Sequence, residues 1–127
     1  MFEVRDGLYY TKDHEWISVD GKKAKFGMAD YAQHEMGDLV YVEVPAVGTH
    51  IAIDEEIGAM ESVKSVEPIY APVSGTIIEV NTDLEDAPDI VNKDPYGDGW
   101  MAVIEMDDPS EIDSLENSEK YRVRLGE

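Results

Sequence analysis

The chain has 127 residues, no cysteine and a formal charge of −19, from 10 basic and 29 acidic side chains. A chain of this length can bury one hydrophobic core, so we expect residues 1–127 to form a single domain. The negative charge argues against nucleic-acid or anionic-membrane partners, because phosphates would be repelled. Without cysteine there is no disulfide, thiolate metal site or cysteine nucleophile, so any redox sulfur must come from an attached group.

The composition also indicates where the protein works. Residues 1–15 contain four acidic side chains and no long apolar run, which is unlike a secretory signal or a transit peptide. No later segment approaches the length of a membrane span. We therefore expect a cytoplasmic protein, and the high charge favours a monomer. The acidic surface either keeps the protein soluble or attracts basic partners, and both explanations stay open.

The first predicted helix begins at Asp30. Its side chain is expected to cap free amide groups, while Gln33 completes a capping box. Gly37 is expected to end this short helix, because glycine readily adopts the left-handed conformation found after helix ends.

Short alternating segments dominate the rest of the chain. Val40, Val42 and Val44 are predicted to point to one face of a strand, and Tyr41 and Glu43 to the other. Similar strands are expected at Ile51–Ile53, Ile57–Val63, Val66–Tyr70, Thr76–Val80 and Trp100–Met106. The pattern predicts a mainly β barrel or sandwich, in which residues 57–80 are compatible with paired hairpins about Lys64.

A second helix is predicted after Asp108, which would cap it. Pro109 suits the first helical position, and Glu111 stands at the reciprocal position of a capping box. Ile112 and Leu115 would then share one face, so we expect this helix to dock on the surface.

One of the seven lysines differs from the others in its surroundings. Lys64 lies within an apolar, strand-like stretch, three residues after Glu61, whereas the other six lie in polar segments. A strand that contains Lys64 is expected to turn there and place the amine in solvent. Exposure alone carries no function, because most lysines are exposed.

Several motifs, in one order, resemble the glycine cleavage system H protein family. They are Tyr10-Thr11-Lys12-Asp13-His14-Glu15-Trp16, Asp30-Tyr31-Ala32-Gln33, Gly37-Asp38-Leu39-Val40, Val44-Pro45-Ala46-Val47-Gly48, Glu61-Ser62-Val63-Lys64, Tyr70-Ala71-Pro72-Val73-Ser74-Gly75 and Asp94-Pro95-Tyr96-Gly97-Asp98-Gly99-Trp100. The resemblance covers roughly residues 8–121, and several motifs together are far more specific than one.

The resemblance implies a barrel-sandwich hybrid of the lipoyl- and biotinyl-carrier type, with short helices that include a C-terminal one. Lys64 would carry covalently attached lipoate, and Glu61 would help a lipoyl ligase or transferase to recognise the hairpin. Glu15 and His34 would belong to a surface that shelters the loaded arm. The chain would be a non-catalytic carrier.

The implied partners are the enzymes of glycine cleavage. A PLP-dependent glycine decarboxylase would load the aminomethyl group of glycine onto the arm, and a tetrahydrofolate-dependent aminomethyltransferase would remove it. A dihydrolipoyl dehydrogenase would then reoxidise the arm. The resemblance also leaves open an H-like carrier that serves sulfur metabolism or lipoate relay, and a non-lipoylated acidic interaction module.

Three features depart from the family pattern. Ser65 follows the lysine where the family usually has alanine, an acidic run occupies residues 54–56, and residues 120–124 are basic rather than acidic. The differences in charge bear on which partners dock. Biotin is disfavoured, because biotin carriers flank their lysine with methionine, whereas Val63 and Ser65 flank Lys64.

The sequence favours neither a metal site nor an intrinsic active site. Residues 94–99 nearly spell a calcium-binding loop, but Tyr96 replaces an oxygen ligand at the third position, so we expect a tight acidic turn. His14, His34 and His50 match no zinc spacing. No P-loop, dinucleotide fingerprint or nucleophile motif is present.

Overall fold

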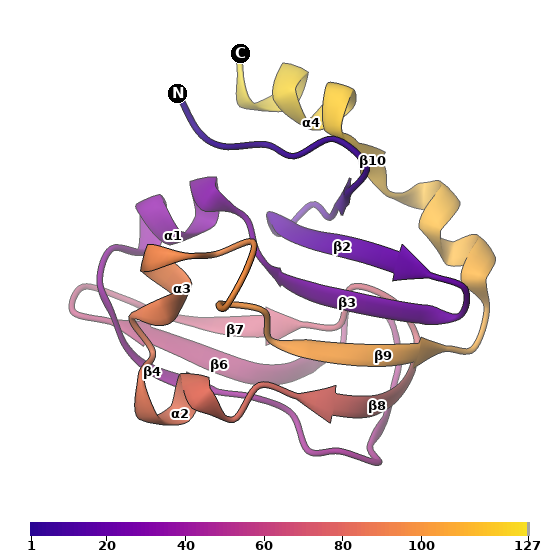
Figure 1. The fold of residues 1–127 in the computed structure, drawn as a ribbon, viewed down its shortest axis with the longest axis horizontal. Coiled ribbons are helices and arrows are strands. Elements are labelled where there is room, and N and C mark those ends of the chain that lie inside the picture. The colour runs from indigo at the N-terminus through magenta and orange to yellow at the C-terminus, as the bar shows by residue number, and fades with distance from the viewer. Residues whose placement is uncertain (127) are drawn as a thin grey trace.

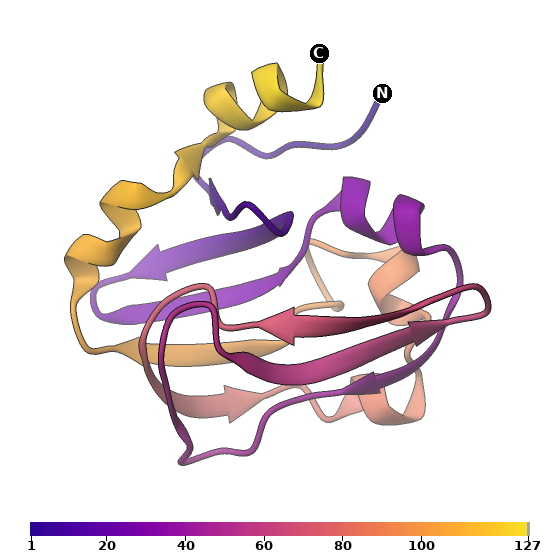
Figure 2. The ribbon, with the colours of Figure 1, turned by 180° about the vertical axis from the view of Figure 1, so that it is seen from behind.

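The computed structural model describes residues 1–126, and its strands form two antiparallel sheets (Figures 1 and 2). The larger sheet has the order β10-β1-β2-β3-β9-β8-β5, and the smaller has the order β4-β6-β7. The strands are β1 (Tyr9–Tyr10), β2 (Glu15–Asp20), β3 (Lys23–Met28), β4 (Leu39–Glu43), β5 (His50–Ile51), β6 (Glu56–Ser62), β7 (Val66–Tyr70), β8 (Gly75–Val80), β9 (Ala102–Met106) and β10 (Glu116–Asn117).

The main core lies between the two sheets. Val42, Met60 and Ile69 come from the smaller sheet, and they belong to one buried cluster with Phe26 and Ile104 of the larger sheet. Burying such side chains supplies most of the favourable free energy of folding. The prediction of a mainly β barrel-sandwich fold is confirmed, although the pairing of the described strands leaves two separate sheets rather than one closed barrel.

Short helices cover the ends of the sandwich. They are α1 (Asp30–Met36), α2 (Asp83–Asp86), α3 (Ile90–Lys93), the 3₁₀ helix η1 (Pro109–Ser114) and the C-terminal α4 (Ser118–Leu125). Helix α4 lies beside the N-terminal segment in both views (Figures 1 and 2). Tyr10, Trp16, Tyr96 and Tyr121 form a second, aromatic cluster there with Ala29. Within residues 1–126, no helix has the length and apolar character needed to cross a membrane.

The predicted alternation along β4 is wrong at Val40. Val42 is buried, but Val40 is 51% exposed, because the pairing of β4 with β6 shifts register between Leu39 and Tyr41. Such a bulge reverses the faces of the residues on one side of it, so Leu39 enters the core in place of Val40. Tyr41 and Glu43 are exposed, as predicted.

The paired hairpins about Lys64 are confirmed only in part. Strands β6 and β7 form one hairpin, whereas β8 lies in the other sheet and pairs with β5 and β9. The turn between β7 and β8 therefore crosses from one sheet to the other.

The helix caps differ from the prediction in two places. The N-cap of α1 is Ala29, and Asp30 is the first helical residue, so Gln33 bonds to the Asp30 carboxylate rather than to a cap amide. Asp108 does cap η1 by accepting from Ser110 N. Glu111, however, accepts from the amide and hydroxyl of Ser74 at 2.7 and 3.0 Å, so it tethers η1 to the start of β8 instead of completing a capping box.

Candidate functional site

Lys64 lies at the exposed turn between β6 and β7, as the sequence predicted. The buried Ser62 organises this turn: its hydroxyl accepts from the amides of Lys64 (3.2 Å) and Ser65 (3.0 Å), and its own amide donates to Ser65 O (2.8 Å). The Lys64 backbone is thus held while its side chain reaches solvent. A single lysine is presented at a defined position.

The base of this turn is tied to α1 and α3. Asn92 donates to Gly37 O (2.9 Å) and accepts from Leu39 N (2.9 Å), which fixes the segment between α1 and β4. A Cβ at Gly37 would come within 3.4 Å of Lys64 Cε, so the aliphatic stem of the lysine lies over this glycine. Gly37 also has φ +79°, a conformation that suits glycine.

An exposed row of side chains crosses the smaller sheet next to the turn. Glu61 pairs with Tyr41 on β4 and with Val66 on β7, and cross-strand partners share a face of a sheet. Tyr41 and Val66 are 46% and 66% exposed, respectively, so both offer apolar area to solvent beside Glu61. The charge of Glu43 is the main cause that raises the pKa of Tyr41, so the row lies in a negative local field.

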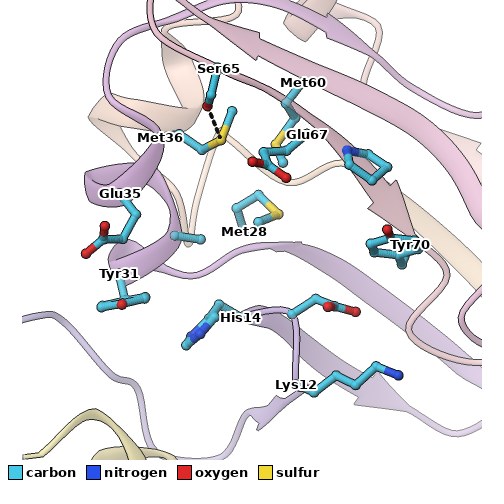
Figure 3. A pocket seen from close by; sticks show the side chains of 13 residues that line it. Lys12, His14, Met28, Tyr31, Glu35, Met36, Met60, Ser65, Glu67 and Tyr70 are labelled. Carbon is cyan, nitrogen blue, oxygen red and sulfur yellow. Dashed lines mark hydrogen bonds between the residues drawn. The ribbon is translucent and has the colours of Figure 1, made fainter.

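A cavity of about 420 Å³ opens between the β6–β7 hairpin, α1 and the turn before β2 (Figure 3). Its floor contains the side chains of Met28, Met36 and Met60, each less than 8% exposed. The other lining residues are Lys12, Asp13, His14, Tyr31, Ala32, Glu35, Ser65, Glu67, Pro68 and Tyr70. The arrangement combines an apolar floor with a charged rim.

Ser65 joins the hairpin to this cavity. Its hydroxyl donates to the sulfur of Met36 at 3.6 Å, drawn as the dashed line in Figure 3. The residue that departs from the usual alanine therefore helps to form the cavity wall.

Glu15 is a buried carboxyl group next to two residues of the cavity wall, Asp13 and His14. It is 2% exposed, and its Oε1 accepts from the Thr11 hydroxyl at 3.2 Å. Its Oε2 has no hydrogen-bond partner among the described residues. Burial, followed by the charge of Asp13, raises the pKa of Glu15 well above its ordinary value. Glu15, which the sequence placed on the sheltering surface, is therefore buried beside the cavity and is not one of its lining residues.

The structure places His34 apart from the cavity lining. Its Nε2 lies 3.5 Å from Asp30 Oδ1, and its ring contacts Phe2 edge-on with centroids 5.3 Å apart. The neighbouring Glu35 lines the cavity instead. Sequence reasoning also missed the three floor methionines, because they come from β3, α1 and β6 and share no local spacing.

The remaining motifs form no metal site in the described part of the chain. Within residues 1–126, no group of three or more His, Asp or Glu side chains is placed to hold a metal ion. Residues 94–99 form a turn in which Asp94 O accepts from the amides of Gly97 and Gly99. The Asp94 carboxylate accepts from Asp98 N, so this oxygen is already used within the turn.

An exposed lysine at a hairpin turn beside a cavity is the arrangement expected of a carrier protein. Residues 8–127 match the glycine cleavage H-protein family. The chain belongs to this family, and it is a non-catalytic lipoyl carrier protein of the glycine cleavage type.

Individual relatives agree with this assignment over nearly the whole chain. The chain is 48% identical over 125 residues to the glycine cleavage system H protein of Thermoanaerobacter sp. (strain X514), covering 98% of each chain. It is 51% identical over 120 residues to that of Geobacillus thermodenitrificans, covering 94% of each. The crystal structure of a glycine cleavage system H protein from Mycobacterium marinum superposes with a TM-score of 0.89 at 34% identity, covering 98% of this chain and 100% of that one.

Proposed function

We propose that this chain carries lipoate in an amide bond to Lys64 Nζ and shuttles the aminomethyl group of glycine. The observation that supports this most is the hairpin, where Ser62 fixes the turn and Lys64 extends into solvent. When bound, the lipoyl group supplies the redox-active sulfur pair that this cysteine-free chain lacks.

The partners in this proposal are a PLP-dependent glycine decarboxylase, a tetrahydrofolate-dependent aminomethyltransferase and a dihydrolipoyl dehydrogenase. Tethering at Lys64 raises the effective concentration of the cargo at each partner's active site. The proposal treats residues 1–127 as one carrier domain that acts as a monomer in the cytoplasm. The 29 acidic side chains, against 10 basic ones, would favour docking on basic partner surfaces.

The row that contains Glu61 is the proposed recognition surface for the lipoyl ligase or transferase. Glu61 offers a carboxylate next to the modified turn, while Tyr41 and Val66 offer apolar area on either side. A charge-assisted hydrogen bond contributes about 1.5–3 kcal/mol. Glu61→Gln is therefore expected to lower kcat/KM for lipoylation about tenfold or more.

The matched control is Glu79→Gln, which removes an exposed carboxylate from β8 in the other sheet. It should leave the kinetics of lipoylation unchanged. Equal effects of the two substitutions would show that only net charge matters and that Glu61 is not recognised.

The cavity is proposed to shelter the loaded arm from water. The three methionines offer a flexible apolar floor that can adapt to an alkyl chain. The part that the resemblance assigns to Glu15 stays a prediction, because its carboxyl group is buried and does not line the cavity. Excluding water would slow loss of the aminomethyl group. The part assigned to His34 stays a prediction.

The test of the function is reconstituted glycine decarboxylation with Lys64→Arg. The variant should fold, because the side chain is exposed, and should support no turnover, because arginine cannot form the lipoyl amide. Lys93→Arg is the matched control, since the Lys93 side chain is 76% exposed and its ion pair with Asp89 tolerates arginine. Turnover by Lys64→Arg equal to that of the control would contradict the proposal.

A further inference from the structure

The C-terminal helix α4 forms hydrogen bonds with the turn that lines one wall of the cavity. Arg124 donates to the carbonyl oxygens of Thr11 (Nη2, 2.7 Å) and Lys12 (Nη1, 3.2 Å). The hydroxyl of Tyr121 lies 2.8 Å from His14 Nδ1. Two side chains of one helix thus contact three residues, Thr11, Lys12 and His14, of a turn that lies more than a hundred residues earlier in the sequence.

The turn needs such support, because His14 has φ +63°, a region that residues other than glycine rarely adopt. Strained residues persist where the surroundings fix them. Tyr121 is fully buried and stacks on Tyr10, with ring centroids 4.1 Å apart. Arg124 is held in turn by Glu116 at 2.7 Å, so the supporting side chains are themselves ordered.

The same contacts reach the buried carboxyl group. The hydroxyl of Thr11 donates to Glu15 Oε1 and accepts from the amides of Asp13 and Glu15, all at 3.2 Å. Arg124 holds the carbonyl oxygen of this threonine. A shift of α4 would therefore move Thr11 and the carboxyl group bonded to it.

The contact between α4 and His14 joins a neutral imidazole ring to a protonated hydroxyl group. Burial, followed by the nearby charge of Arg124, lowers the pKa of His14, so its ring is neutral at pH 7. Burial raises the pKa of Tyr121, so its hydroxyl keeps its proton. His14 Nδ1 is the one hydrogen-bond partner of the Tyr121 hydroxyl among the described residues, so we assign the hydroxyl as the donor, and the His14 ring then carries its proton on Nε2.

The basic residues near the end of the chain form hydrogen bonds within the molecule. Arg122 bonds to Asp6 and to Val4 O, each at 2.8 Å, while Arg124 bonds to Thr11 and Lys12. These arginines tie α4 to the N-terminal part of the chain. Their contacts do not require a partner protein.

We propose that Tyr121 and Arg124 are positioning residues, through which α4 holds the His14 wall of the cavity and the Glu15 carboxyl group in place. The inference rests on the proposed sheltering of the arm. It predicts that α4 sets how long the loaded arm survives, without affecting attachment of lipoate. In Figure 2 the tip of the β6–β7 hairpin lies at the right and the yellow helix α4 lies at the top, so the two elements are not adjacent.

The experiment compares wild type with Tyr121→Phe and Arg124→Met. Tyr121→Phe keeps the ring that stacks on Tyr10 and removes only the hydroxyl. The matched control is Val123→Ala, on the same helix, because Val123 is 72% exposed. Nitrogen-15 NMR of the His14 ring reports the tautomer, and amide hydrogen exchange reports the order of residues 11–15.

The functional measurement is spontaneous release of ammonia from the loaded protein without tetrahydrofolate. In this reaction water supplies the oxygen of formaldehyde, the carbon–nitrogen and carbon–sulfur bonds of the aminomethyl group break, and the products are formaldehyde, ammonium and the free thiol. In each variant we expect either that the His14 ring loses its preference for the Nε2–H tautomer or that the amides of residues 11–15 lose their protection from exchange. Both variants should release ammonia at least threefold faster than wild type. Lipoylation at Lys64 and the control should match wild type.

The outcomes separate this inference from the function on which it rests. If the wild-type arm is long-lived and both variants match it, the inference is overturned and sheltering stands. If wild-type protein releases ammonia as fast as free aminomethyl dihydrolipoamide, sheltering fails and the inference fails with it. If Val123→Ala accelerates release as much as the variants, α4 acts through general stability and not through Tyr121 and Arg124.

Discussion

Replacing Glu15 by glutamine should change how stability depends on pH. The carboxyl group is 2% exposed, one of its oxygens has no partner among the described residues, and burial raises its pKa. The folded state therefore keeps the proton to a higher pH than the unfolded chain, whose ordinary value is 4.5. Between these two pKa values the folded state binds more protons, so the free energy of unfolding falls as pH rises.

Glutamine has nearly the same shape and no such ionisation. Below pH 4.5 the two proteins should have similar free energies of unfolding, because Glu15 is protonated in both the folded and unfolded states. Above pH 4.5, the folded wild type must either keep the Glu15 proton or bury an unpaired carboxylate. Leaving a buried polar group unsatisfied costs about 1–3 kcal/mol, and a charged group costs more. Glu15→Gln should therefore gain at least about 1–3 kcal/mol relative to wild type as pH rises.

Urea unfolding from pH 4 to pH 9, followed by the fluorescence of the two tryptophans, Trp16 and Trp100, measures this difference. Glu79→Gln, which removes an exposed carboxylate, is the control and should show no comparable trend. A difference in the free energy of unfolding between Glu15→Gln and wild type that is constant across this range would contradict a raised pKa of Glu15 in the folded state. It would mean that the Glu15 carboxyl group is solvated or paired in the folded protein.

Three further predictions follow from the packing and the charge. Glu111→Ala should lower the free energy of unfolding by about 1–3 kcal/mol, because Ser74 N would lose its acceptor, and leave lipoylation unchanged; unaltered urea stability would contradict the tether. Gly58→Ala should destabilise the protein by about 1–3 kcal/mol in the same assay, because a Cβ there would collide with Glu43 O, and a neutral effect would show that β4 can move aside. Partner enzymes should bind more weakly in 500 mM than in 50 mM salt, since the charge of −19 is screened; affinity that is independent of salt would make the acidic surface incidental.

The local features of the hairpin could be predicted from the sequence. Val66–Tyr70 is a strand with the predicted bounds, and Lys64 lies at the exposed turn. The error at Val40 arose because a bulge depends on the pairing with β6, which the alternation of one strand does not reveal. Glu111 fits a local capping pattern equally well, but a partner 37 residues away competes for its side chain.

The N-terminal hairpin was not predicted, although a signal is present. Glu15–Asp20 and Lys23–Met28 pair across a two-residue turn at Gly21, whose φ of +61° suits glycine. The hydrogen bond between Tyr121 of α4 and His14 differs from this local signal, because it joins side chains 107 residues apart. No spacing or periodicity in one sequence encodes such a contact, so the shape of the cavity could not be predicted.

The most direct test of the carrier function is an intact mass, with peptide mapping, of the protein produced with lipoate and a lipoyl ligase. We expect one lipoyl adduct, confined to the peptide that contains Lys64, with the six other lysines unmodified. An unmodified Lys64, under conditions that modify a known acceptor protein, would contradict the carrier function and favour a non-lipoylated interaction module.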